Sequence, residues 1–381
     1  MRIFVLGVPH TQTTRAFNTC PFTMKAWYQC QMLHRRGHEV IHIGVEGSDP
    51  ECTENVAAIS QAEWSALYDP GAKFYTTKTD GPFAEYQKLY ATRVREALDA
   101  RVTRPWEAIV SCTWGDAQIA ATRGLAQFVV ESGVGYRHTW AKYRVFVSYA
   151  WMHFHYGKEG KHAGNGWYDV VIPNEIDPAL FDFRPQDKTD ELLFMGRLND
   201  DKGVALAIDV AKRVGRKIAI VGQGDPARFL KDNPHARYLP PVDVAGRRKL
   251  MAEAAAFLCP SQYIEPLGNV ALEAQASGTP VICTDWGGFT ETVLHGVTGY
   301  RCRTMEQFVW AAKNIDRIDP AACRQWAIDN FSTQRIGPMF EEYYQMLLDL
   351  DGDGWYAARP ERQQLDWLTK RFPGGRVRDP A

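Results

Sequence analysis

Residues 192–203 have the sequence Leu-Leu-Phe-Met-Gly-Arg-Leu-Asn-Asp-Asp-Lys-Gly. The first four residues form a short apolar run, which is typical of a strand buried in a parallel sheet. Gly196 ends this run, and Arg197 and Lys202 follow it, five positions apart. Doubly wound α/β sheets bind their ligands beyond the carboxyl ends of the strands. The stretch therefore predicts a parallel α/β sheet with two cations at its ligand-binding edge.

Strand and helix patterns alternate on both sides of this stretch. In the first half of the chain, they predict strands at 3–6, 39–44, 108–112 and 127–131, and helices at 22–36 and 83–100. In the second half, they predict strands at 192–196, 217–222, 256–259 and 280–284, and helices at 203–213, 245–254 and 268–276. Such alternation is typical of α/β folds in which helices cover a parallel sheet.

The length of 381 residues is about twice what one hydrophobic core usually organises, so two domains are expected. Residues 170–178, Val-Val-Ile-Pro-Asn-Glu-Ile-Asp-Pro, carry the prolines and turn formers of an interdomain hinge. We expect an amino-terminal domain at 1–173 and a carboxyl-terminal domain at 174–335. Residues 336–381 are expected to form C-terminal helices, for which packing back on the first domain is one option.

The composition indicates which partners and which cellular location to expect. Lys and Arg number 44 against 45 Asp and Glu, so the net charge of −1 gives no strong signal for nucleic acid or anionic lipid. The eight cysteines include no C-x-x-C pair, so reduced thiols and a cytoplasmic location are expected. The apolar run at the amino terminus ends at Pro9, which is too short for a signal peptide or a transmembrane segment.

Residues 265–273, Glu-Pro-Leu-Gly-Asn-Val-Ala-Leu-Glu, place two carboxylates around the start of a predicted helix. Gly268 and Asn269 would offer free backbone N–H groups and the positive end of the helix dipole to a phosphate. Glu273, about one turn further in, would reach the hydroxyls of an attached ribose, and Glu265 those of a group on the other side. Solvated helix charges are the ordinary alternative.

Arg197 and Lys202 carry the complementary charge. At the end of one strand, two cations can clamp a diphosphate, with Arg giving forked contacts and Lys a point charge. The alternative is a pair of surface cations neutralised by Asp200 and Asp201.

The order of these motifs resembles that of retaining nucleotide-sugar glycosyltransferases of the GT-B fold, family 4. The resemblance rests on Gly-Arg-Leu-x-x-x-Lys-Gly, Glu-x7-Glu and Gly-Thr-Pro-Val in the second half. Further matching motifs lie at 37–40, 172–177, 221–225, 287–293 and 296–299. The resemblance implies two Rossmann-like, doubly wound parallel-sheet domains that face a central cleft, with the donor in the second domain and the acceptor in the first.

The resemblance also implies roles for individual residues. Arg197 and Lys202 would hold the donor diphosphate, Glu273 the ribose and Glu265 the transferred sugar, so Glu265, Arg197 and Lys202 are the catalytic candidates. The remaining donor-binding candidates are Gly196, Gly222, Leu239, Leu267, Gly268 and Asn269. The implied co-substrate is a nucleoside-diphosphate sugar, UDP- or GDP-linked, with no other cofactor and no metal required.

Two regions depart from the family pattern. The loop at 9–21 is long and contains no glycine, whereas the family loop is glycine-rich. The histidine that many members place after a strand of the first domain, facing the sugar, is also missing from the matching strand. The candidates for that place are Glu131, His138 and His153.

Other functions fit parts of the sequence. Residues 222–227, Gly-Gln-Gly-Asp-Pro-Ala, approximate a dinucleotide fingerprint, so an NAD(P)-dependent oxidoreductase is one alternative. A non-catalytic protein that binds nucleotide sugars is another. Residues 349–354 resemble the start of a calcium loop, but position 360, where its closing glutamate should fall, is Pro360. The acceptor stays open among small molecules, glycans, proteins and modified nucleic acids.

Overall fold

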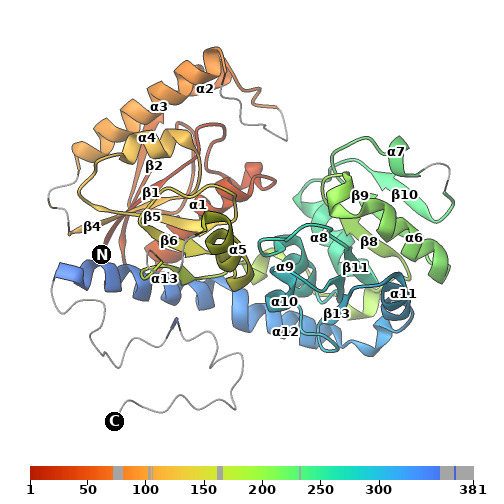
Figure 1. Ribbon diagram of the computed structural model, residues 1–381. Coiled ribbons are helices and arrows are strands. Elements are labelled where there is room, and N and C mark those ends of the chain that lie inside the picture. The colour runs from red at the N-terminus through yellow and green to blue at the C-terminus, as the bar shows by residue number, and fades with distance from the viewer. Residues whose placement is uncertain are drawn as a thin grey trace, which may run out of the picture. The chain divides into compact units, whose positions relative to one another are not determined.

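A computed structural model of the chain describes residues 1–71, 80–101, 104, 106–160, 166–230, 233–351 and 364–365 (Figure 1). Contacts between residues divide the chain into two units, and each contains its own parallel sheet. Unit 1 comprises Met1–Phe146, His162–Ile172 and Ile336–Ala381. Unit 2 comprises Val147–Lys161 and Pro173–Arg335.

The sheet of unit 1 has seven strands in its described part, all parallel, in the order β3-β2-β1-β4-β5-β6-β7. Strand β1 lies between β2 and β4, with Ile3 opposite Val40 on one side and Ile109 on the other. The order of the strands therefore reverses between β1 and β4. The strands are β1 (Arg2–Leu6), β2 (Glu39–Val45), β3 (Glu54–Ile59), β4 (Ala108–Cys112), β5 (Phe128–Val134), β6 (Tyr143–Phe146) and β7 (Val170–Val171).

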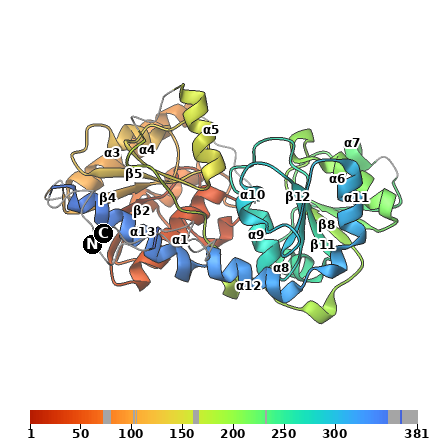
Figure 2. The same ribbon diagram turned by 60° about the horizontal axis from the view of Figure 1, so that its bottom comes forward.

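Helices cover both faces of this sheet (Figures 1 and 2). One face packs on α3 and α4 through a core that includes Tyr90 and Val94. On the other face, the Tyr344 hydroxyl bonds Gln29 of α1 at 2.9 Å and Ser132 of β5 at 2.7 Å. The helices are α1 (Pro21–Arg35), α2 (Gln61–Ser65), α3 (Pro82–Asp99), α4 (Asp116–Thr122) and, from Ile336 onward, α13 (Thr333–Leu348), with 3₁₀ turns at Arg15–Phe17 and Asp349–Asp351.

The sheet of unit 2 repeats this topology with six described strands, all parallel, in the order β10-β9-β8-β11-β12-β13. The order reverses between β8 and β11, which are neighbours in the sheet. The strands are β8 (Leu192–Met195), β9 (Ile218–Val221), β10 (Ala236–Leu239), β11 (Ala256–Cys259), β12 (Val281–Thr284) and β13 (Gly299–Cys302).

Two buried clusters flank the sheet of unit 2, so it is also doubly wound. One joins it to α6 and α11, and the other to α8 and α9, as both views show (Figures 1 and 2). The two parallel sheets with helices on both faces confirm the predicted fold class of two doubly wound α/β domains. The helices are α5 (Tyr149–Glu159), α6 (Val204–Val214), α7 (Ala227–Leu230), α8 (Val244–Glu253), α9 (Asn269–Ala276), α10 (Phe289–Thr292), α11 (Met305–Lys313) and α12 (Pro320–Phe331), with 3₁₀ turns at Pro178–Leu180, Pro185–Asp187, Asp200–Lys202 and Ile315–Arg317.

Helix α5 departs from the expected domain division. It lies at 149–159, inside the range expected for the first domain, but it packs in unit 2. Ser148 Oγ donates to Pro266 O at 2.6 Å, and the backbone N–H groups of Tyr149 and Ala150 donate to Glu291 at 2.9 and 2.8 Å. These bonds tie the start of α5 to the loop that contains Pro266 and to α10 of unit 2, although the sequence places α5 before the hinge.

None of the helices in the described part of the chain has a stretch of 18 residues that is apolar enough to cross a membrane.

Candidate functional site

The loops that follow β8 and β11 meet at the point where the strand order of unit 2 reverses. The Gln262 N–H donates to Asp201 O at 2.7 Å and so joins the two loops. Gly203 has a φ of +73°, and a Cβ there would lie 2.1 Å from Pro260 O, so only glycine allows this close approach. Doubly wound folds bind ligands at such a switch point. The stretches singled out at 192–203 and 265–273 therefore converge on one place in unit 2.

Glu265 is the centre of this site. Its Oε2 atom accepts hydrogen bonds from Lys202 Nζ at 2.8 Å, Tyr263 OH at 2.6 Å and Ser261 Oγ at 3.1 Å. The Lys202 and Glu265 side chains are 20% and 12% exposed, so the ion pair is largely shielded from water. The Oε1 atom accepts no hydrogen bond from the residues that the structure describes. Glu265 is thus held firmly by one oxygen while its other oxygen stays available.

Tyr263 completes this arrangement. The Lys202 ammonium also lies over its ring, 5.0 Å from the centroid. Burial, reinforced by the Glu265 charge, raises the pKa of Tyr263, and the charge of Arg197 opposes that shift. Tyr263 therefore keeps its proton and acts as a donor to Glu265 at neutral pH.

The alternative that Asp200 neutralises Lys202 does not match these contacts. Lys202 pairs with Glu265, whereas the neighbouring Asp200 pairs with Arg228 at the surface. Arg197 is exposed, and no described residue forms an ion pair or a side-chain hydrogen bond with it. Its guanidinium is therefore open to a ligand.

Two consecutive glycines, Gly287 and Gly288, pack against the backbone of the Glu265 loop. A Cβ on Gly287 would lie 2.8 Å from both the N and O atoms of Glu265, and a Cβ on Gly288 would lie 2.5 Å from Leu267 Cα. The Gly288 N–H donates to Glu265 O at 2.8 Å. Because these two positions have no side chains, their backbone packs directly against the backbone of the Glu265 loop. This contact fixes the position of the Glu265 backbone.

Helix α9 begins beside this loop. Gly268 has a φ of +88°, and a Cβ there would lie 2.4 Å from Phe289 Cε1. No side chain caps the helix, and Asn269 Oδ1 accepts a bond from Asn174 Nδ2 at 3.1 Å. The first N–H groups of a helix have no acceptor within it and carry partial positive charge, so they favour an anion.

Glu273 lies one turn into α9 and has a partner from α8. Its Oε2 atom accepts a bond from Arg247, a residue that the sequence analysis did not single out. Burial raises the pKa of Glu273, and the Arg247 charge opposes that rise. No described residue bonds the Oε1 atom. As at Glu265, one oxygen is anchored and the other is available.

We expect Arg247→Met to destabilise the fold in a pH-dependent way. The folded pKa of Glu273 already lies above its ordinary 4.5, so its contribution to stability is largest at low pH and falls as pH rises through the folded pKa. Removing Arg247 raises that pKa further. The free energy of unfolding should therefore drop by about 1 to 3 kcal/mol near pH 7, and by much less near pH 4.5.

Denaturant unfolding at the two pH values measures this effect. Arg248→Met, one position along α8, is the matched control, because Arg248 pairs with the more exposed Asp182. An equal loss at both pH values in Arg247→Met would contradict the assigned role of the pair.

Three of the expected donor-binding residues, Gly196, Gly222 and Leu239, lie together at the carboxyl ends of neighbouring strands. The Gly222 N–H donates to Leu239 O at 3.3 Å, and a Cβ on Gly222 would lie 1.8 Å from Gly196 O. These three residues follow or end β9, β10 and β8, respectively. Leu267 differs, because it is only 2% exposed and so offers a ligand little side-chain surface.

The three candidates for the residue that faces the sugar differ in burial and in the unit to which they belong. Glu131 is fully buried in β5, where its carboxylate accepts bonds from Tyr136 OH at 2.7 Å, Trp140 N at 2.9 Å and Ala141 N at 2.8 Å. His138 is exposed on the connection after β5. His153 is exposed on α5 and therefore belongs to unit 2, which corrects its expected place in the first domain.

Sequence reasoning missed an aromatic group at the switch point of unit 1. His10 follows β1 and is 3% exposed, and its ring lies edge-on to Trp114, which follows β4, with 6.2 Å between centroids. Phe22 stacks on Trp114, with 5.0 Å between ring centroids and 10° between the ring planes. Burial lowers the pKa of His10 to about 4, so it is neutral at pH 7. The position of Trp114 directly after a predicted strand was the available signal.

The structure bears on two other functions that parts of the sequence fit, an oxidoreductase and a calcium-binding loop. The described part of the helix after β9 spans four residues, and Gly222 and Gly224 pack closely against the loop after β8, so within the described residues the fingerprint of an oxidoreductase has no long phosphate-binding helix. Residues 352–354 of the possible calcium loop at 349–354 lie outside the described residues. Within the described ranges, no group of three or more His, Cys, Asp or Glu side chains is placed to hold a metal ion.

Known proteins resemble this chain most clearly in sequence over its second half. Residues 176–318 match the family model described as glycosyl transferases group 1. The glycogen synthase of Mycobacterium tuberculosis is 34% identical over 212 residues, which cover 51% of this chain and 50% of that protein. The chain thus spans about half the length, or less, of the curated relatives that it matches.

Solved structures match over more of the chain. AviGT4, a glycosyltransferase involved in avilamycin A biosynthesis, has a TM-score of 0.67 at 19% identity and covers 91% of this chain and 98% of its own. HepE of Anabaena in complex with UDP-glucose has a TM-score of 0.62 at 15% identity and covers 91% and 99%. At these identities the likeness shows the fold alone, which is the GT-B fold expected from the sequence.

Proposed function

We propose that this chain, whose residues 176–318 match the family model of glycosyl transferases group 1, is a retaining glycosyltransferase. It would take a sugar from a nucleoside-diphosphate sugar and transfer it to an acceptor. The observation that carries the proposal is Glu265, anchored through Oε2 by three donors, with Oε1 available, next to the start of α9. A solved protein of the same fold in complex with UDP-glucose supports the choice of donor class.

The positive charges would bind the diphosphate. Arg197 is open to a ligand, Lys202 in the loop after β8 pairs with Glu265, and the first N–H groups of α9 directly follow the loop that carries Glu265. Breaking the sugar–phosphate bond builds negative charge on the leaving diphosphate, and groups already oriented toward that charge lower the barrier. Lys202 would stay in contact with both Glu265 and a phosphate oxygen.

The two glutamates would bind the hydroxyl-bearing ends of the donor. Glu265 Oε1 would accept hydrogen bonds from the transferred sugar, and Glu273 Oε1 from the ribose. Gly196, Gly222 and Leu239 would border the base. In each glutamate, the anchored oxygen fixes the orientation of the other before the donor arrives, which limits the entropy lost on binding.

The proposed chemistry keeps the configuration of the sugar. The acceptor hydroxyl attacks the anomeric carbon from the side of the leaving group, so that a new carbon–oxygen bond forms as the bond to the diphosphate oxygen breaks. A phosphate oxygen takes the proton of the acceptor hydroxyl. The Glu265 carboxylate, on the sugar side, stabilises the positive charge that develops on the ring.

Release of nucleoside diphosphate tests the proposal. We expect one sugar nucleotide of a UDP- and GDP-sugar panel to raise the unfolding temperature, and about 2.7 kcal/mol of stabilisation corresponds to a ligand at 100 times its Kd. The same donor should yield free nucleoside diphosphate, slowly with water or faster with an acceptor. Donor binding without any release would favour the non-catalytic alternative, and failure of every donor to bind would overturn the proposal.

A further inference from the structure

The connection between β5 and β6 contains no helix. Parallel neighbours usually need a connection of about a dozen or more residues, commonly a helix that covers the sheet. Here residues 135–142 cross without a helix. The carboxylate of Glu131 bonds the backbone N–H groups of Trp140 and Ala141, and so pins this segment onto the face of β5.

A pocket of about 400 Å³ lies between this segment and the end of α4. Such a volume is within the range of about 300 to 1,000 Å³ that is typical of small-molecule sites. The pocket lies at the amino ends of β5 and β6, whereas His10 and Trp114 follow the carboxyl ends of β1 and β4. It is therefore distinct from the edge of the sheet where ligands of such folds usually bind.

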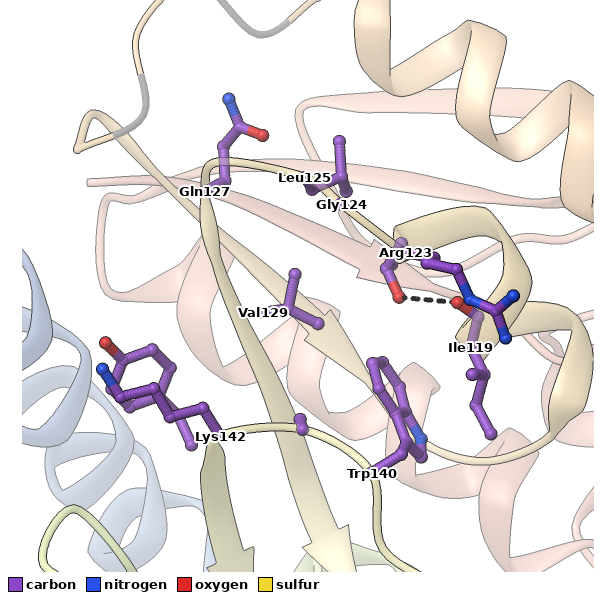
Figure 3. Close-up of a pocket in the computed structure, with 11 residues that line it drawn as sticks. Ile119, Arg123, Gly124, Leu125, Gln127, Val129, Trp140 and Lys142 are labelled. Atoms are coloured by element: carbon purple, nitrogen blue, oxygen red, sulfur yellow. Dashed lines mark hydrogen bonds between the residues drawn. The ribbon is translucent and has the colours of Figure 1, made fainter.

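The lining combines an apolar body with cations. Ile119, Leu125, Val129 and the Trp140 ring supply apolar surface. Figure 3 shows Arg123 and Lys142 on opposite sides of the pocket, with Val129 between them. No acidic residue is among the described lining residues, and no described carboxylate pairs with either cation.

Trp140 supplies a further donor. Its Nε1 atom is buried, and no described residue accepts a hydrogen bond from it. A buried N–H without an acceptor is costly, so it favours a ligand atom or a water that can accept. The Lys142 ammonium lies 5.2 and 5.3 Å from the rings of Tyr143 and Tyr168, which hold it at the rim without neutralising it.

We propose that this pocket is a second binding site, which takes a small organic anion with a flat apolar body, such as an aromatic carboxylate. The apolar part lies on Val129, Leu125 and the Trp140 ring. The anionic group accepts hydrogen bonds from Arg123 or Lys142, and the Trp140 N–H finds its acceptor in the same ligand. The site does not depend on the proposed glycosyl transfer, because none of its residues contributes to the donor site.

Calorimetric titration of 2-naphthoate against its neutral analogue 2-naphthamide tests the proposal. We expect the carboxylate to bind about tenfold or more tightly than the amide. The double variant Arg123→Gln/Lys142→Gln should lose this preference. Lys212→Gln/Arg213→Gln, which removes the same charge from exposed positions on α6 of unit 2, should keep it.

Trp140→Phe keeps an aromatic wall but removes the N–H group, and should weaken binding of the carboxylate while the circular dichroism spectrum stays unchanged. It also provides an independent test if the double variant fails to fold. Absence of binding, equal binding of the two compounds, or a preference that survives in Arg123→Gln/Lys142→Gln would overturn the proposal.

Discussion

Glu265→Gln should lower kcat by about a hundredfold or more, while the unfolding temperature changes little. The variant keeps the size of the side chain, and its amide oxygen can still accept bonds from Tyr263 and Ser261. It loses the negative charge that holds Lys202 and that would face the developing positive charge of the sugar ring. Removing one oriented electrostatic contact from an active site commonly costs about 100- to 1,000-fold in kcat.

Steady-state kinetics and thermal unfolding separate these effects. Asp200→Asn is the matched control, because it removes the same charge two positions from Lys202, at an exposed residue that pairs with Arg228. The control should stay within about twofold of the parent in kcat, as expected for an exposed ion pair. If Glu265→Gln retained more than half of the parent turnover, Glu265 would not have the proposed role facing the sugar.

The buried strands could be predicted because local sequence determines them. Strands β1, β4, β8 and β11 are mostly apolar and buried on both faces, and the sequence predicts each within two residues. Strands β6 and β10 were missed. They contain Arg144 and Arg237, whose charges are paired with Asp169 and Glu191 from elsewhere in the chain. Such pairing cannot be inferred from a window of a few residues.

Helix α11 was missed despite a local signal. Thr304 and Gln307 form a capping box at its start, and this spacing is visible in the sequence. Helix α5 was missed for another reason. Its place in unit 2 depends on bonds from Ser148 and from the N–H groups after it to Pro266 and to Glu291 of α10, both more than 100 residues away.

The sequence predicted which residues form the candidate site better than it predicted which partners they contact. The sequence indicates that Arg197, Lys202, Glu265 and Glu273 follow strands or begin a helix, which brings them to one sheet edge. The partners of these residues depend on packing between distant segments. Glu265 takes Lys202, 63 positions away, and Glu273 takes Arg247 from another helix.

Lys202→Met should weaken binding of the nucleoside diphosphate about tenfold or more. The substitution keeps an apolar stem that can lie on the Tyr263 ring, and it removes the ammonium that pairs with Glu265 and would contact the phosphates. A charge-assisted hydrogen bond contributes about 1.5 to 3 kcal/mol, which corresponds to at least a tenfold change in Kd. Arg197→Met should show a similar loss of affinity with a smaller change in stability, because Arg197 is exposed and has no described partner.

A double-mutant cycle distinguishes the two cations. The loss of turnover in the double variant Lys202→Met/Glu265→Gln, expressed as a free energy, should be much smaller than the sum of the losses in the two single variants. Each single variant already breaks the same ion pair. Arg197→Met and Glu265→Gln do not share a contact and should combine almost additively. Calorimetric titration with the diphosphate of the preferred donor gives the affinities, and single-turnover kinetics give the rates. Unchanged diphosphate affinity in both Lys202→Met and Arg197→Met would exclude these residues from the diphosphate site, whatever the behaviour of Glu265.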